Sequence, residues 1–133
     1  MIAVIDFGMG NIHSCLKAVS LFTKEFILTS DPLDLKNATG VILPGDGAFE
    51  KAMSNLKELK MKEALDEFVH FGKPLFGICI GFQILFNDSE ESPIKDRIVP
   101  GFGWIDGSVR RFKGKNYKVP HMGWNNINFI KGK

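Results

Sequence analysis

Short apolar runs alternate with amphipathic stretches through the first part of the chain. Four runs have the length and the β-branched, apolar composition of buried strands; they cover residues 2–6, 26–29, 40–44 and 75–78. Apolar residues at three- and four-residue spacing predict a helix over 16–22, and one broken helix or two short ones over 49–71. Another helix can begin at Ile80. This order favours a doubly wound α/β fold with a mainly parallel sheet.

The pattern changes near residue 88. A polar loop over 88–93 is followed by short extended runs that are rich in glycine and aromatic residues. These runs predict antiparallel hairpins, or an antiparallel addition to the sheet, after residue 95. We expect residues 1–133 to form a single domain. Its last apolar run lies directly before Lys131, and we therefore expect the domain to be incomplete on its C-terminal side.

Composition excludes several classes of protein. With 44% hydrophobic and 24% charged residues, the 133-residue chain is typical of a globular domain. Its net charge of +2 is too small to indicate nucleic acid or an anionic membrane as a partner. No signal peptide, membrane span or metal-ligand spacing is present in the sequence, so we expect a cytoplasmic protein without metal or cofactor. Two cysteines are too few for a disulfide-rich secreted domain.

The sharpest local motif is GICIG at residues 77–81, where a strand should become a helix. It has the spacing of the G-x-S-x-G turn with Cys79 in place of serine. Such a turn projects its central side chain from the end of the strand, and a helix beginning at Ile80 would favour the thiolate. The Ile80 amide would then face an oxyanion. From the spacing alone, a nucleophile and an inert buried thiol both remain open for Cys79; Cys15 is expected to be a core residue.

Two further glycine turns follow predicted strands. Gly45 and Gly47 follow the third strand, and their backbone amides can supply a second oxyanion donor, although a plain strand-to-helix turn has the same composition. The turn at Gly8 and Gly10 lacks the third glycine of a dinucleotide-binding motif, because His13 stands there. Because ligands bind beyond the carboxyl ends of parallel strands, we expect the three turns to meet at one edge.

Four motifs occur in order along the chain: IDFGMGN at 5–11, PGDGAF at 44–49, GICIGFQ at 77–83 and PHMGWN at 120–125. Together they resemble the motifs of class I (triad-type) glutamine amidotransferases. They are most similar to those of the glutaminase subunits of imidazole glycerol phosphate synthases, which act in histidine biosynthesis. The resemblance covers residues 1 to about 130, and it implies the flavodoxin-like α/β fold of that family.

The resemblance implies a chemistry for the motif residues. Cys79 would attack the side-chain amide of L-glutamine, giving a glutamyl thioester and ammonia, and water would release glutamate. Gly47 and Ile80 would provide the donors of the oxyanion hole. Gly45 and Gln83 would help to hold the substrate.

The resemblance also implies a partner. In the family, ammonia passes to a synthase (cyclase) subunit with a (β/α)8 barrel. Asn11, His121 and Trp124 match positions that face this partner or the ammonia route, although Trp124 can equally be a packing aromatic. Related subunits serve the amidation of surface sugars, so the ammonia acceptor stays open.

Two departures from the family pattern bear on the proposed chemistry. Asp46 stands in the glycine turn where the family usually has an apolar residue, and its charge can oppose a thiolate or oxyanion. The family's His-Pro-Glu-like motif, which supplies the base for the cysteine, has no match among His13, His70 and His121. We therefore expect little glutaminase activity from the 133 residues alone. A catalytically silent module of the same fold and a flavodoxin-like binder of small ligands remain alternatives.

Overall fold

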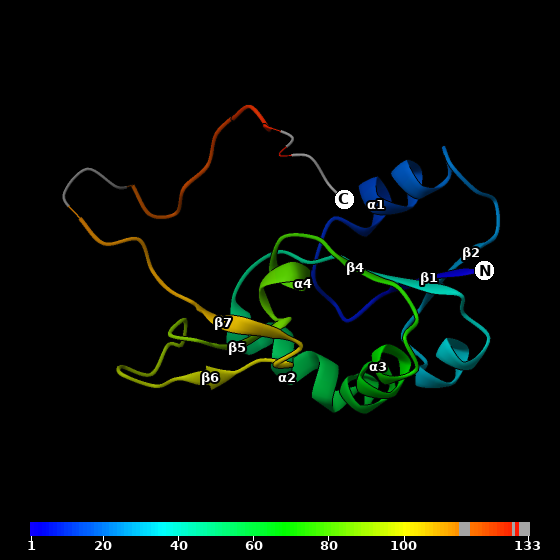
Figure 1. Ribbon diagram of the computed structural model, residues 1–133, viewed down its shortest axis with the longest axis horizontal. Helices are drawn as coiled ribbons and strands as arrows, with labels where there is room; N and C mark the ends of the chain where they lie inside the picture. Colours follow the sequence, from blue (N-terminus) through cyan, green and yellow to red (C-terminus); the bar gives the residue numbers. More distant parts are fainter. Residues whose placement is uncertain (115–117, 129, 131–133) are drawn as a thin grey trace.

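A computed structural model gives the structure of the chain and describes residues 1–114, 118–128 and 130. The four predicted strands form one sheet in the order β2-β1-β3-β4, and every neighbouring pair is parallel (Figure 1). These strands are β1 (Ile2–Ile5), β2 (Phe26–Thr29), β3 (Gly40–Leu43) and β4 (Leu75–Gly77). The predicted α/β fold class with a mainly parallel sheet is confirmed.

Helices connect these strands. They are α1 (Ile12–Val19), the short 3-10 helix η1 (Pro32–Lys36), α2 (Phe49–Glu58), α3 (Met61–His70) and α4 (Ile80–Gln83). The first helix begins earlier than predicted because Asn11 caps it, and it ends at Val19, before the exposed Leu21 and Phe22. The helical stretch over 49–71 is two helices, since the backbone at Lys60 turns to a positive φ of 56°. Figure 1 shows α1 on one side of the sheet, and α2 and α3 on the other.

The core lies between the sheet and the α2–α3 pair. Residues Ala3 and Ile5 of β1 are fully buried. From the helices, the buried side chains recur at three- and four-residue spacing: Phe49, Ala52, Leu56, Met61, Leu65 and Phe68. Burial of these side chains provides the hydrophobic free energy that fixes both helices on the sheet.

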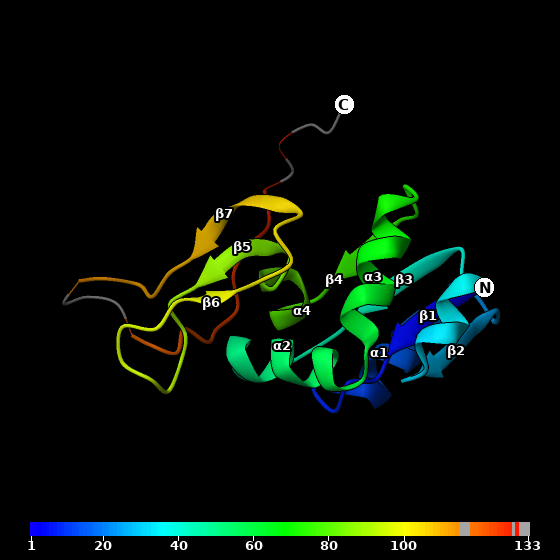
Figure 2. The same ribbon diagram turned by 90° about the horizontal axis from the view of Figure 1, so that it is seen from below.

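The second half contains a separate three-stranded sheet in the order β6-β5-β7 (Figure 2). Its strands are β5 (Phe86–Ser89), β6 (Val99–Pro100) and β7 (Ile105–Val109). The predicted antiparallel pairing is confirmed for β5 and β6 but is wrong for β7, which pairs parallel to β5. The reason is the connection after β6. It crosses the start of β5, where the Phe102 amide bonds to Ile84 O and the Trp104 amide to Leu85 O, and so carries β7 to the other side of β5.

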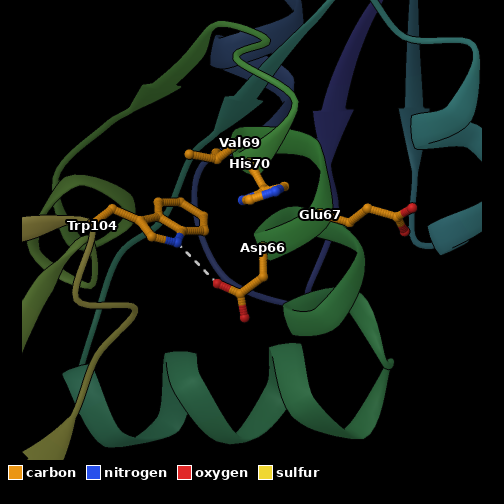
Figure 3. A pocket seen from close by; sticks show the side chains of 5 residues that line it. All are labelled: Asp66, Glu67, Val69, His70 and Trp104. Carbon is orange, nitrogen blue, oxygen red and sulfur yellow. Dashed lines mark hydrogen bonds between the residues drawn. The ribbon is translucent and has the colours of Figure 1, made fainter.

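The second sheet contacts the helices that cover the first sheet, and its clearest contact is with α3. The Trp104 indole Nε1 donates a hydrogen bond of 2.9 Å to Asp66 Oδ1 on α3, across a shallow hollow that His70 also lines (Figure 3). The Trp104 ring stacks on Phe102 with centroids 4.0 Å apart. The predicted polar loop is shorter than expected, since residues 88 and 89 belong to β5.

After β7, the described residues of 110–130 contain neither helix nor strand. Figure 1 shows this segment, orange to red, standing away from the packed elements. Several of its apolar side chains are almost wholly exposed: Met122, Trp124, Ile127 and Ile130. Among the described residues, no helix has both the length and the apolarity needed to cross a bilayer.

Candidate active site

Cys79 lies on a sharp bend between β4 and α4. Its backbone has φ 55° and ψ −115°, a conformation that is strained for any residue except glycine. The bend is closely packed, because a Cβ on Gly77 would lie only 2.5 Å from Gly81 O. The Cys79 side chain is exposed. The predicted turn is therefore present, and the alternative of a thiol buried in the core is wrong.

Backbone hydrogen bonds fix both sides of this bend. Before it, the Ile78 amide donates to Leu43 O of β3 at 3.0 Å. After it, the amides of Phe82 and Gln83 each donate to Cys79 O at 3.0 Å, which begins α4. Ile80 is buried, and its amide has no hydrogen-bond partner within the described part of the chain.

The glycine turn after β3 packs directly against the bend. A Cβ on Gly45 would overlap Ile80 Cγ2 and would lie 3.4 Å from the Gly81 nitrogen. Gly47 is exposed with φ 86°, and no hydrogen bond of its amide is present among the described residues. The prediction that this turn lies beside the Cys79 turn is confirmed.

The turn after β1 completes this edge. A Cβ on Gly10 would lie 3.0 Å from Gly45 Cα, and the Gly10 amide donates to Asp46 Oδ1 at 3.1 Å. From α2, Asn55 Nδ2 donates to Phe7 O at 2.8 Å and holds the same turn. All three glycine turns thus meet at the carboxyl ends of β1, β3 and β4, as predicted.

The remaining site residues predicted from the sequence have different surroundings. Gln83 is half-buried on α4. Asn11 is exposed and caps α1, its Oδ1 accepting a hydrogen bond of 3.0 Å from the Ser14 amide. A capping role explains this asparagine locally, because an N-cap side chain satisfies an amide of the first helical turn.

His121 and Trp124 belong to the extended segment after β7. The His121 ring lies edge-on to Phe112 with centroids 6.2 Å apart, and its Nε2 is 3.4 Å from Asn125 Nδ2. Trp124 is fully exposed. Figure 1 shows the described part of the segment that carries both residues standing away from the packed elements that form this edge.

Cys79 has no basic partner among the described residues. No hydrogen bond joins its thiol to His13, His70 or His121, each of which is exposed. The other cysteine, Cys15, is half-buried on α1, and burial raises the pKa of its thiol. Within the described part of the chain, no group of His, Cys, Asp or Glu residues could hold a metal ion.

Sequence reasoning missed two carboxylates that hold the glycine turn. Asp46 was expected only to repel negative charge, yet its carboxylate bonds to the Gly10 amide. Glu91 Oε2 accepts a hydrogen bond of 3.0 Å from the Phe49 amide at the start of α2. No local pattern could have indicated this second contact, since the two residues are 42 positions apart.

The comparisons with known proteins agree with this geometry. Residues 4–120 match the family model of the CobB/CobQ-like glutamine amidotransferase domain. A solved structure, "Crystal structure of glutamine amidotransferase", superposes with a TM-score of 0.67 at 21% identity, covering 83% of this chain and 56% of that one. At that identity the likeness supports the fold alone.

Curated relatives share more sequence. The "Imidazole glycerol phosphate synthase subunit HisH" of Geobacillus sp. is 46% identical over 97% of this chain and 62% of its own length. Those of Bacillus cereus and Gloeobacter violaceus are 49% and 40% identical, over 58% and 55% of their lengths. The chain therefore spans about three fifths of the curated relatives that it matches. With 117 of its 133 residues inside the matched model, the chain belongs to the family of CobB/CobQ-like glutamine amidotransferase domains.

Proposed function

We propose that the chain acts as the glutamine-hydrolysing subunit of an imidazole glycerol phosphate synthase, with Cys79 as its nucleophile. The observation that carries the proposal is the exposed Cys79 on a strained bend, packed against a second glycine turn. Relatives with 40–49% identity carry the name of such a subunit, which supports this assignment.

The proposed reaction is an acyl transfer. The Cys79 sulfur bonds to the carboxamide carbon of L-glutamine, the C–N bond breaks, and the nitrogen leaves as ammonia after it takes up a proton. Water then attacks the thioester carbonyl, and glutamate leaves as the thiol is restored. The Ile80 and Gly47 amides would donate to the oxyanion in both steps, and their lack of partners among the described residues supports this role.

Gly45 and Gln83 are proposed to hold the substrate. Gly45 has no side chain, so its turn packs directly against the bend that carries Cys79, and this places its backbone beside the proposed nucleophile. Gln83 lies one helical turn after Cys79, and its amide group is able to hydrogen-bond to a bound amino acid. We expect neither metal nor cofactor to take part in this chemistry.

The proposed partner is a synthase (cyclase) subunit with a (β/α)8 barrel, which receives the ammonia. Asn11, His121 and Trp124 would face this subunit or the ammonia route. The exposure of all three side chains supports a role at an interface. A cytoplasmic location and a single domain over residues 1–133 remain parts of the same proposal.

A second candidate function is that of a catalytically silent module with the same fold, which docks on a synthase without delivering ammonia. The absence of a hydrogen bond between the Cys79 thiol and any described histidine favours it. Nucleophilic cysteine chemistry needs a base that takes and returns a proton.

Affinity labelling tests the first proposal. A chloromethyl ketone analogue of glutamine should alkylate Cys79 stoichiometrically, and excess L-glutamine should protect it; the Cys79→Ser variant should remain unlabelled. Mass spectrometry of the digested protein identifies the labelled residue. If Cys79 reacts at the rate of a free thiol and glutamine gives no protection, the proposed function is wrong. If labelling is normal but no glutamate forms in the presence of the synthase subunit, the silent module is correct.

A further inference from the structure

The turn between β3 and α2 has little internal structure of its own. It runs from Gly45 to Ala48, and the backbone at Gly47 has a positive φ of 86°. Glycine adopts many conformations at similar cost, so this turn needs outside contacts to hold one of them. Its conformation sets the direction of the Gly47 amide, which is a proposed donor.

One such contact is made by a residue of the turn, Asp46. The Asp46 carboxylate reaches back to the turn after β1 and accepts a hydrogen bond of 3.1 Å from the Gly10 amide. That turn is itself well anchored. The Gly8 amide donates to Asp6 Oδ1 at 3.0 Å, and Asn55 of α2 holds Phe7 O. Asp46 therefore ties the glycine turn after β3 to the anchored turn after β1.

A second carboxylate holds the other end of the turn. Ala48, at the N-cap of α2, offers no side-chain hydrogen bond, and Glu91 Oε2 instead accepts from the Phe49 amide. The loop that carries Glu91 is tied to the same helix by Ser92 Oγ, which donates to Glu50 Oε2 at 2.6 Å. This contact lies at the start of α2, whereas the hydrogen bond of Asp46 lies within the stretch that contains Gly47.

We propose that Asp46 is a positioning residue for the reaction at Cys79: its hydrogen bond to the Gly10 amide holds the Gly45–Ala48 turn in the conformation that presents the Gly47 amide. The inference rests on the proposed function. In this proposal the hydrogen bond of Asp46 supports the reaction, whereas its negative charge does not. A carboxylate opposes the negative charge that develops on a nearby oxyanion. Asparagine has the same acceptor oxygen without the charge, so it should serve at least as well.

Two thiol reagents separate positioning from general structure. In the chloromethyl ketone analogue of glutamine, the C–Cl bond breaks as the sulfur bonds to the methylene carbon; chloride leaves and the thiol proton passes to solvent. The ketone oxygen of this reagent takes the place of the substrate carbonyl and depends on the oxyanion donors. Iodoacetamide alkylates the same sulfur by direct displacement and does not need those donors.

The experiment compares Asp46→Ala, Asp46→Asn and Asp106→Ala in the 133-residue chain. Asp106 is the matched control, an exposed aspartate in the second sheet that accepts a hydrogen bond of 2.8 Å from Asn87 Nδ2. In Asp46→Ala, the rate constant for the ketone should fall roughly tenfold or more, as when an oxyanion donor is misplaced, while that for iodoacetamide should stay unchanged. Asp46→Asn should react with the ketone at least as fast as the native chain, and Asp106→Ala should equal it.

Three outcomes would overturn the inference. Asp46→Ala can react with the ketone as fast as the native chain. Asp46→Asn can fall as far as Asp46→Ala, so that the charge and not the hydrogen bond is needed. Asp46→Ala can also lose both reactions equally, which indicates a general structural role. Failure of the proposed function is visible separately, because the native chain would then show no glutamine-protected labelling at all.

Discussion

The three glycine turns and the segment after β7 both carry motifs that resemble those of the glutamine amidotransferase family. They differ in packing, hydrogen bonding and exposure to solvent. The turns pack backbone against backbone, and hydrogen bonds join them to one another and to α2. The described part of the segment has neither helix nor strand, and it exposes Met122, Trp124 and Ile127. The turns thus owe their geometry to the sheet within this chain. The described part of the segment leaves large apolar side chains in contact with solvent instead of packing them against the rest of the chain.

The largest expected effect is a loss of stability when a methyl group is added in the packed region and not in the segment after β7. In Gly81→Ala, the new Cβ would collide with Leu43 O, a backbone atom that cannot move without disturbing β3. We expect the free energy of unfolding to fall by about 3 kcal/mol, the upper part of the range for overpacked cores. Gly123→Ala in the segment is the control, since nothing lies within 4 Å of its new Cβ. Urea unfolding of both variants measures the difference, and equal midpoints would contradict it.

The next effect concerns binding. Trp124→Ala should leave the free energy of unfolding within about 0.5 kcal/mol of the native value, because its side chain is fully exposed. Its affinity for the synthase subunit should fall about tenfold or more, as expected when a central aromatic side chain of an interface is removed. Titration calorimetry with the purified synthase subunit measures the dissociation constant. Unchanged affinity would make Trp124 irrelevant to docking.

Asn11 sharpens the comparison, because it belongs to the packed region and yet is a proposed interface residue. Asn11→Ala removes the cap of α1 and should lower the free energy of unfolding by about 1 kcal/mol. Asn11→Ser keeps an oxygen acceptor at the cap and should retain most of the stability. If the serine variant is stable but binds the synthase subunit weakly, the asparagine has both roles. If the serine variant is as unstable as the alanine variant, the cap does not explain the residue.

The smallest expected effect is a dependence on pH. Burial raises the pKa of the Cys15 thiol above its ordinary value, so the folded state holds this proton more tightly than the unfolded chain does. The contribution to stability is therefore fully present below the pKa of the unfolded thiol and is lost as the pH rises through the raised value of the folded state. Cys15→Ala should make the urea midpoint less sensitive to pH between about 8 and 10. A slope identical to that of the native chain would contradict this account.

The two regions also differ in how far the sequence predicts them. The parallel strands and the Cys79 bend were predictable because glycine spacing and apolar runs reflect local backbone demands, and the strand order brings the turns together. The side of β5 on which β7 pairs was not predictable. It depends on hydrogen bonds that the backbone amides of residues 102–104 donate to carbonyl oxygens at the start of β5. No periodicity in the sequence indicates these hydrogen bonds.

The contacts of single carboxylates were equally hidden. The same Asp46 can repel an oxyanion or hold a turn, and only the position of the Gly10 amide decides which. Glu91 contacts the start of α2 from a loop that is remote in sequence. Sequence analysis therefore identified the bend that carries Cys79, the proposed nucleophile, but not the residues that hold its surroundings.

The different settings of the two tryptophans give the chain a built-in optical reporter for each region. Trp104 stacks on Phe102 and bonds to Asp66, so its indole should emit at shorter wavelength than Trp124, which water surrounds. Unfolding should shift the Trp104 emission to the red, whereas docking of a partner on the segment should shift that of Trp124 to the blue. Shifts of the emission maximum in opposite directions would thus distinguish unfolding of the chain from binding to the proposed synthase subunit.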